Sequence, residues 1–277
     1  MRSAAMCWLF LSGVLAGQTA TEWIQQGVEA YKAAQYDEAI DSFKQAVIGE
    51  PKSLRAHLYL ATAYLADLYT TGSRSDDKTR RAQQEFASVL ELDPNNLAAL
   101  SSLMTLSLQQ ANAAGAVEKP RLLEDSREWC TKVLAVDPKN KEAHYTIGVI
   151  QWSKFYPAYQ AARARLGLKA EDPGPFKDAK LRVALRNEWG LTLQDAIDHF
   201  ERALDLDPHY DAAMTYMNLV IRQRADLADN AYAYQAEIVK AEVWAKKAIA
   251  TKREKDLAAG PTTPFSLAPP PLPVVSR

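Results

Sequence analysis

Small and aromatic residues recur with one helical spacing at four places along the chain. In DAIDHFERALDLDP, which ends at Pro208, Ala196, Phe200 and Ala203 are spaced by four and then three residues. This spacing places the three side chains on one face of a helix, where small residues let a neighbouring helix approach and the aromatic ring fills the gap. The same places hold Ala39, Phe43 and Ala46 before Pro51, Ala82, Phe86 and Val89 before Pro94, and Ser126, Cys130 and Val133 before Pro138.

Each of these predicted helices ends in front of a proline. The strings LELDPNN (90–96), LAVDPKN (134–140) and LDLDPHY (204–210) repeat one arrangement of leucine, aliphatic residue, Asp and Pro. Proline has no N–H to donate, and it disfavours the helical conformation of the residue before it. We therefore predict that a buried helix stops at each Asp-Pro pair.

The residues upstream of Pro51 extend this pattern over a second helix. The segment TEWIQQGVEAYKAAQYDEAIDSFKQAVIGEP carries Trp23, Gly27, Tyr31 and Tyr36 ahead of Ala39, Phe43, Ala46 and Pro51. This order resembles the tetratricopeptide repeat, a helix–turn–helix unit of about 34 residues, although Gln26 replaces the usual Leu. Gly148 and the Ala196–Pro208 helix form a second strong match, and weaker matches lie between and after them. The resemblance covers about residues 21–250. Within the family, the chain resembles exported bacterial members that carry insertions inside the repeats.

The resemblance implies an all-α solenoid of about five tetratricopeptide-like helix hairpins with an inserted helical pair. The prolines lie 43, 44 and 70 residues apart, and each excess over 34 falls between the two helices of a repeat. Insertions repeated at this place build one rim of a solenoid, often a binding face. The expected repeats are about 21–52, 53–95, 96–139, 140–209 and 210–250, with the helical insertion at about 153–193.

The insertion is predicted to hold two helices of its own. YPAYQAARARLG begins with Pro157 and ends at Gly167, and FKDAKLRVALRNEWG ends at Gly190. Proline favours a helix start and glycine a helix end. Residues 154–190 carry eight Lys or Arg and four Asp or Glu. This basic segment is either a site for an anion or an acidic partner, or a set of charges paired internally with the acidic frame.

Both ends of the chain differ from the repeats. Residues 1–16, MRSAAMCWLFLSGVLA, have the basic start, apolar run and small residues of a secretory signal peptide, the alternative being a buried N-terminal helix. No other stretch is long and apolar enough for a stable membrane span, so we expect an exported protein, periplasmic or secreted. Removal of residues 1–16 leaves Cys130 alone, so no internal disulfide is expected. Residues 256–277 are Pro-rich and are predicted to form a disordered tail.

In tetratricopeptide proteins the first helices of successive repeats line a concave groove. The family's positions carry over to Ile24, Val28, Tyr31, Lys32, Leu58, Thr62, Leu65, Ser101, Thr105, Leu108, Tyr145, Val149, Trp152, Thr215, Leu219 and Arg222. Most are apolar, which argues against a clamp for a C-terminal carboxylate. Exposed tyrosine and tryptophan suit an amphipathic helix or an extended apolar peptide. The alternative is that these side chains pack against the inserted helices.

Composition and motifs give no reason to expect nucleic-acid binding, cofactor binding or catalysis. The net charge of −1 gives no reason to expect a nucleic-acid partner. The four histidines are spread out, and no metal-binding, nucleotide-binding or catalytic motif is present, so neither a cofactor nor an enzymatic activity is expected. We expect a protein–protein interaction or scaffold protein acting outside the cytoplasm. The alternative is an obligate structural subunit of a cell-envelope complex, which would co-purify with its partners or aggregate alone.

Overall fold

The computed structural model describes residues 18–71, 76–169, 171–259 and 272–273. The regular secondary structure of these residues is helical throughout. The helices of the first three hairpins are α1 (Ala20–Lys32), α2 (Tyr36–Gly49), α3 (Leu54–Thr71), α4 (Asp76–Leu92), α5 (Leu97–Ala113) and α6 (Lys119–Val136). The helices of the last two are α7 (Lys141–Arg165), α8 (Ala179–Leu206), α9 (Asp211–Ala225) and α10 (Ala231–Ala259).

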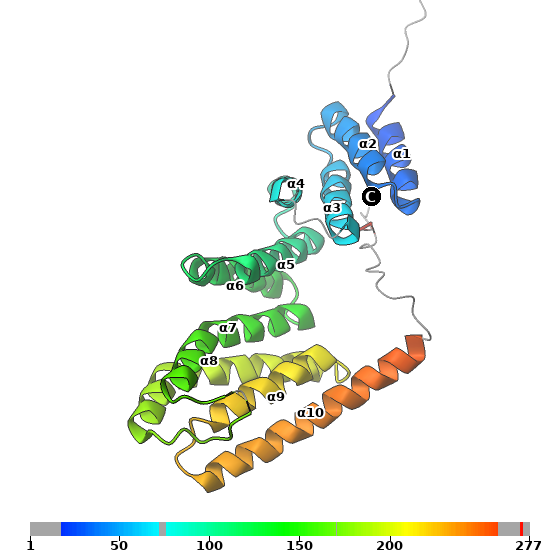
Figure 1. Ribbon diagram of the computed structural model, residues 1–277. Coiled ribbons are helices and arrows are strands. Elements are labelled where there is room, and N and C mark those ends of the chain that lie inside the picture. Colours follow the sequence, from blue (N-terminus) through cyan, green and yellow to red (C-terminus); the bar gives the residue numbers. More distant parts are fainter. Residues whose placement is uncertain (1–17, 72–75, 170, 260–271, 274–277) are drawn as a thin grey trace, which may run out of the picture.

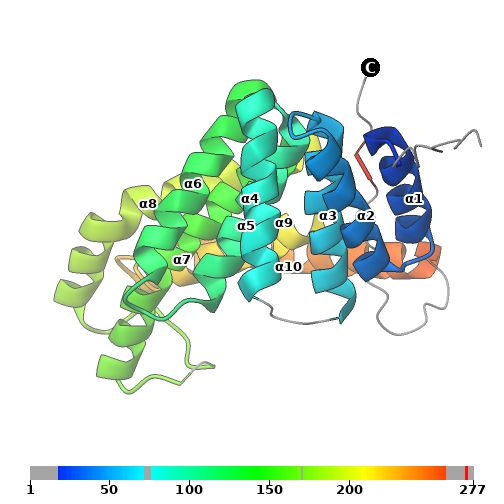
Figure 2. The same ribbon diagram turned by 90° about the horizontal axis from the view of Figure 1, so that it is seen from above.

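Consecutive helices pair into five hairpins, and each hairpin contacts the next. The pairs are α1 with α2, α3 with α4, α5 with α6, α7 with α8, and α9 with α10. Figure 1 shows the hairpins following one another from α1 to α10, and Figure 2 shows the same stack from above. The predicted all-α solenoid of helical hairpins is therefore confirmed.

Two glycines let the helices of a hairpin touch. A Cβ atom placed on Gly27 would lie 2.5 Å from a ring carbon of Phe43, and one on Gly148 would lie 2.5 Å from a ring carbon of Phe200. Real Cβ atoms do not approach a ring so closely, so the phenylalanine occupies the space that a side chain would need. The helix faces chosen from the spacing are buried at Ala39, Phe43, Ala46, Ala82, Phe86, Cys130, Val133, Ala196, Phe200 and Ala203.

The prolines of the repeat pattern lie outside this core. Pro51, Pro94, Pro138 and Pro208 are exposed, each in a turn after a helix has ended. As members of the repeat pattern they are expected in the repeat core, and the structure corrects this expectation. Their contribution is to stop the helix, since each lies within two residues of the last helical position.

The residues around two of these prolines also start the next helix. Asn96 accepts a hydrogen bond from the Ala99 N–H at 3.1 Å, and Asn140 accepts one from the Ala143 N–H at 3.0 Å. Each asparagine also donates its amide to the Asp before the proline, Asp93 or Asp137. An N-cap of this kind satisfies a helix N–H that would otherwise lack a partner. The Asp-Pro-x-Asn string therefore ends one helix and begins another.

The insertion is not a separate pair of helices, which corrects the predicted helices at 157–167 and 176–190. Helix α7 has 25 residues and runs through Pro157, and α8 has 28 residues and runs through Gly190. Both helices continue because their buried faces continue. Phe155 and Tyr159 are buried on either side of Pro157, and Leu185 and Leu193 on either side of Gly190. The insertion therefore lengthens the fourth hairpin.

The loop at the end of this long hairpin is attached to the turn between α9 and α10. The Arg163 guanidinium lies 3.0 Å from the Asp226 carboxylate, and both side chains are buried. The Tyr159 hydroxyl donates to the same carboxylate at 2.7 Å. The Phe176 N–H donates to the Asp226 carbonyl at 2.9 Å. The long fourth hairpin and the fifth hairpin are thus joined by a buried polar network.

The two ends of the chain are only partly described. The predicted signal peptide at 1–16 lies outside the described residues. Helix α10 continues to Ala259, so it includes the first residues of the predicted tail, because the run up to Gly260 contains no helix-breaking residue. Leu272 packs against the hydrophobic core of the first hairpins, which corrects the expectation that the tail does not pack. In the described part of the chain, no helix is long and apolar enough to cross a membrane.

Candidate peptide-binding groove

Five of the predicted groove residues belong to the core. Ile24, Leu58, Thr62, Leu65 and Val149 have exposed fractions of 2–5%. The Thr62 hydroxyl donates to the Leu58 carbonyl at 2.7 Å within its own helix. These side chains face the neighbouring helices, so the prediction that they line an open groove is wrong.

Tyr31 is also buried, with an exposed fraction of 6%. Its ring meets that of Tyr36 edge-on, with 5.4 Å between centroids. Both rings belong to the hydrophobic cluster of the first three hairpins, against which Leu272 packs. Burial raises the pKa of the Tyr31 hydroxyl above its ordinary value. The prediction that Tyr31 stays partly accessible is therefore wrong in this structure.

The other predicted groove residues reach the surface. Val28, Leu108 and Leu219 are partly exposed, as are Tyr145 and Trp152. Polar residues among them are tied to their own helices: Lys32 to Glu29 at 3.1 Å, the Thr105 hydroxyl to the Ser101 carbonyl at 3.0 Å, and Arg222 to Asn218 at 2.8 Å. The apolar and aromatic residues among them are half-buried, whereas Lys32, Thr105, Thr215 and Arg222 are exposed.

Tyr145 lies in a group of aromatic rings that joins the fourth and fifth hairpins. Its ring centroid is 6.0 Å from that of Phe200, 5.0 Å from that of Tyr210 and 5.7 Å from that of Tyr216. Phe200 is fully buried, whereas the three tyrosine rings are partly exposed. These contacts hold the tyrosine rings in place without covering them completely.

Trp152 extends this group of rings along α7, about two helical turns beyond Tyr145. Its ring centroid lies 4.8 Å from that of Tyr156 and 5.3 Å from that of Tyr216. The indole N–H donates to the Gln223 side-chain oxygen at 3.0 Å. Trp152 was expected either to bind a partner or to pack against the inserted helices; its ring contacts Tyr156, which lies in the insertion, and its other two partners lie in α9. We call Tyr145, Trp152, Tyr156 and Tyr216 the aromatic surface.

Two residues of the aromatic surface were not predicted from the sequence. Tyr156 follows Trp152 by one turn, and a helix predicted to continue past it would have placed both on one face. Tyr216 follows the predicted groove residue Thr215 directly. Each residue turns an α-helix by about 100°, so an error of one position selects a different face.

Internal pairing accounts for five basic residues of the insertion. Lys154 pairs with Glu124, Arg163 with Asp226, Arg165 with Asp178 and Arg186 with Asp229, while Arg182 donates to the carbonyls of Phe176 and Asp229. Most of these partners lie in the insertion loop or in the α9–α10 turn. At these positions, the structure supports internal pairing of the basic segment over a site for an anion or an acidic partner.

Reactive groups in the described residues are few. Cys130 is buried in the predicted core position, and burial raises the pKa of its thiol to about 12. His144 and His199 face each other with 3.0 Å between their Nδ1 atoms, and burial lowers the pKa of His199. Within the described ranges, no three His, Cys, Asp or Glu side chains are grouped as a metal site would need.

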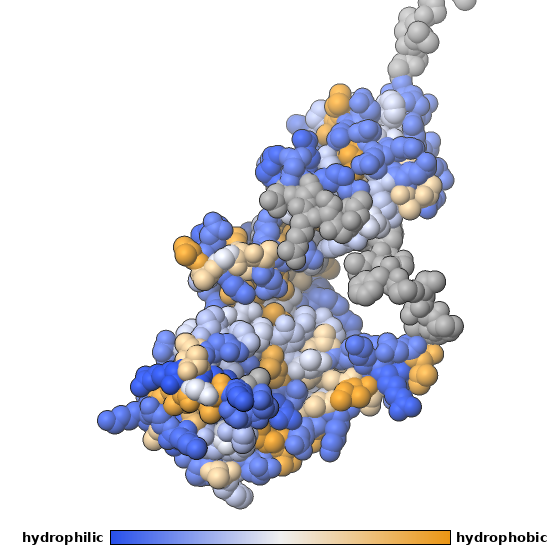
Figure 3. Space-filling model, viewed as in Figure 1, coloured by the Kyte–Doolittle hydropathy of each residue, from blue (hydrophilic) through white to orange (hydrophobic). Residues whose placement is uncertain are grey.

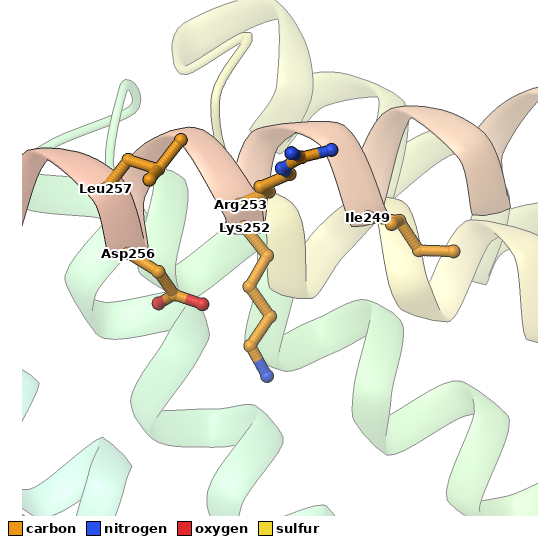
Figure 4. Close-up of a pocket in the computed structure, with 5 residues that line it drawn as sticks. All are labelled: Ile249, Lys252, Arg253, Asp256 and Leu257. Atoms are coloured by element: carbon orange, nitrogen blue, oxygen red, sulfur yellow. The ribbon is translucent and has the colours of Figure 1, made fainter.

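A hollow beside the last turns of α10 offers little for recognition. Its lining residues are Ile249, Lys252, Arg253, Asp256 and Leu257, all from one helix (Figure 4). In that view the charged side chains point in different directions, so they do not converge on one point. Figure 3 shows exposed apolar residues along the same helix. The aromatic surface remains the best-organised accessible feature.

Comparisons with known proteins agree with this fold. Residues 24–67 match the family model TPR_16, described as a tetratricopeptide repeat. The crystal structure of the MamA protein is 14% identical, with 90% of this chain and 100% of that chain covered and a TM-score of 0.54. A MamA segment from residue 41 to the end, from Desulfovibrio magneticus RS-1, is 16% identical, with coverages of 87% and 98% and a TM-score of 0.55. No curated protein matches the sequence.

A stack of helical hairpins with an extended exposed surface is the architecture of a helical-repeat solenoid. Residues 24–67, which match the family model, span α1, α2 and most of α3, and the same hairpin geometry continues to α10. Residues 24–67 thus match a tetratricopeptide repeat in sequence, and the described chain has the fold of a tetratricopeptide solenoid.

Proposed function

We propose that this protein is a non-enzymatic scaffold that binds a peptide or protein segment on the aromatic surface of its concave groove. The observation that carries the proposal is the aromatic surface itself. Tyr145, Trp152 and Tyr156 from α7 and Tyr216 from α9 stand side by side, each partly exposed. Tyrosine and tryptophan offer large apolar faces together with polar tips, which is why they are enriched at binding sites.

The aromatic surface is held in its binding arrangement before a partner arrives. The Trp152 indole is hydrogen-bonded to Gln223, and the tyrosine rings contact one another. Immobilising a free side chain on binding costs about 0.5–1.5 kcal/mol, so rings that are already fixed retain more of their contact energy. This favours an apolar helix or an extended apolar segment as the bound element.

A second candidate function is that of an obligate subunit of a cell-envelope complex. Its support is the outer side of α10, where Val239, Val243, Ile249 and Leu257 have exposed fractions of 47–73%. Terminal hairpins of solenoids normally need a polar outer face for solubility. An obligate subunit should aggregate when purified alone, whereas a free scaffold should purify as a soluble monomer.

Action outside the cytoplasm is part of the proposal and rests on the sequence of residues 1–16. A basic residue, an apolar run and small residues before Gly17 are typical of a cleaved signal peptide. N-terminal sequencing of the protein isolated from its host should find a chain that begins near Gly17. A mature protein that still begins at Met1 would contradict export by this route.

The aromatic surface can be tested with a peptide selected from a random displayed library against the wild-type chain. Trp152→Ala should weaken binding of that peptide at least about thirtyfold, which corresponds to about 2 kcal/mol for an aromatic anchor. The matched control is Trp244→Ala, since Trp244 is another partly buried tryptophan, on α10. Fluorescence anisotropy measures the dissociation constants.

Because Trp152 also contacts α9, its loss can lower stability. Tyr156→Ala is therefore measured as a second variant, and circular dichroism checks that both variants keep their helical content. Equal weakening by Trp152→Ala and Trp244→Ala, or loss of binding only in proportion to unfolding, would show that these rings serve packing.

A further inference from the structure

Leu272 and Pro273 lie against the N-terminal hairpins although they follow α10 in the sequence. Leu272 is partly buried and packs against the cluster formed by the first three hairpins. Figures 1 and 2 both show this short segment beside α1 and α3, on the same side of the stack as the C-terminal end of α10. The chain thus returns from its last helix to its first hairpins.

We infer that the N-terminal part of the groove binds the chain's own C-terminal segment around Leu272 and Pro273 as an intramolecular ligand. The inference rests on the proposed function, because it concerns occupancy of the same concave groove. The segment binds in cis: the groove and the segment that fills it belong to the same molecule.

The surface that receives Leu272 is apolar and aromatic. The cluster against which Leu272 packs has Tyr31, Leu58 and Leu65 among its buried members, and Val28, Leu68, Tyr59 and Tyr69 lie partly buried against it. Val28, Tyr31, Leu58 and Leu65 are predicted groove residues, and Tyr59 follows Leu58 directly in α3. Leu272 packed on this cluster removes apolar area from solvent.

The chemistry of the segment suits this surface. Residues 268–275 read APPPLPVV, which has no charged side chain and four prolines. Proline-rich segments favour the extended polyproline conformation before they bind, so little conformational entropy is lost on docking. Aromatic-lined grooves are a common way of recognising such segments. The ligand class that fits here is therefore a short, uncharged, proline-rich peptide with an aliphatic anchor.

Covalent attachment makes a weak contact sufficient. Twelve residues, 260–271, connect α10 to Leu272, and a chain of that length can extend at most about 40 Å. A short tether gives an effective concentration of about 1 mM, so an intrinsic dissociation constant of about 100 µM leaves the groove about nine-tenths occupied. An external peptide that competes for this part of the groove would then bind about tenfold more weakly than it would to an empty groove.

The test uses full-length protein and a fluorescently labelled synthetic peptide of residues 261–277. Leu272→Asp in the protein should release the segment, so this variant should bind the labelled peptide about tenfold more tightly than the wild type. The matched control is Leu257→Asp, because Leu257 is an exposed leucine on α10, and it should bind the peptide as the wild type does. A peptide that itself carries Leu272→Asp should not bind any of the three proteins.

Equal affinity of the wild type and the Leu272→Asp variant, or no binding to either, would overturn the inference. A wild-type dimer that Leu272→Asp converts to a monomer, measured by light scattering, would assign the segment to a second copy and overturn the cis arrangement. Adding Trp152→Ala to the Leu272→Asp variant should leave binding of the tail peptide unchanged. The tail inference can therefore fail while Trp152-dependent binding of the selected peptide stands.

Discussion

His57 shows how one side chain joins a hairpin to the turn before it. Its Nδ1 atom lies 2.6 Å from the Glu85 carboxylate, and its Nε2 atom lies 3.0 Å from the Pro51 carbonyl oxygen. Both partners are acceptors, so both ring nitrogens donate only when the ring is protonated. The hydrogen bond to Glu85 therefore raises the pKa of His57 above its ordinary value, against the opposing effect of burial.

This shift makes part of the stability depend on pH. Because the pKa of His57 is higher in the folded than in the unfolded chain, its contribution is fully present below the unfolded pKa of about 6.5 and is lost as the pH rises through the folded pKa. His57→Gln should therefore lower the free energy of unfolding more at pH 6 than at pH 9. Urea unfolding at the two pH values measures this difference, with His209→Gln, an exposed histidine, as the control. An equal loss at both pH values would show that His57 is neutral in the folded protein.

At the scale of the helices, glycines at two positions have opposite roles. Gly148 lies against the Phe200 ring with no room for a Cβ atom, whereas a Cβ atom on Gly190 would meet only Arg186 at 3.8 Å. Gly190 lies in the interior of α8, where glycine is less favourable than alanine. The same residue type is thus required in one hairpin position and merely tolerated in another.

Alanine substitutions should separate the two glycines. Gly148→Ala should destabilise the protein by about 1–3 kcal/mol, because the added methyl group displaces the Phe200 ring. Gly190→Ala should stabilise it by about 0.5–1 kcal/mol, because it removes the flexibility of glycine from a continuous helix. Chemical denaturation gives both values. A destabilising Gly190→Ala would mean that α8 is interrupted there, as the sequence alone suggested.

The helices and their pairing could be predicted from the sequence. Ala39, Phe43 and Ala46 have the spacing of a buried helical face, and the same spacing recurs in the later repeats. The continuity of α7 and α8 could not, since Pro157 and Gly190 favour helix ends locally and the contacts that override them come from the neighbouring hairpins. The exposure of the groove residues was also predicted less well than the helices, because it depends on contacts with other elements. Whether Leu58 or Tyr31 is accessible depends on which elements cover it, and Leu272 lies more than two hundred residues away in the sequence.

At the scale of the whole solenoid, the two proposed binding surfaces lie on different hairpins. The first hairpins carry the apolar cluster against which Leu272 packs, and the last two carry the aromatic surface. Each hairpin of a solenoid depends mainly on its neighbours, so contacts at one end need not disturb the other. The protein can therefore hold its own segment at one end while the aromatic surface stays available to a partner.

We propose that partners bind on the aromatic surface of this solenoid. A crystal structure of the full chain bound to the selected peptide would locate the binding surface. We predict that the peptide lies along α7 and α9, with apolar side chains in contact with the rings of Tyr145, Trp152 and Tyr156. A peptide bound instead on the outer side of α10, against Val243 and Ile249, would show that the aromatic surface is not the binding site.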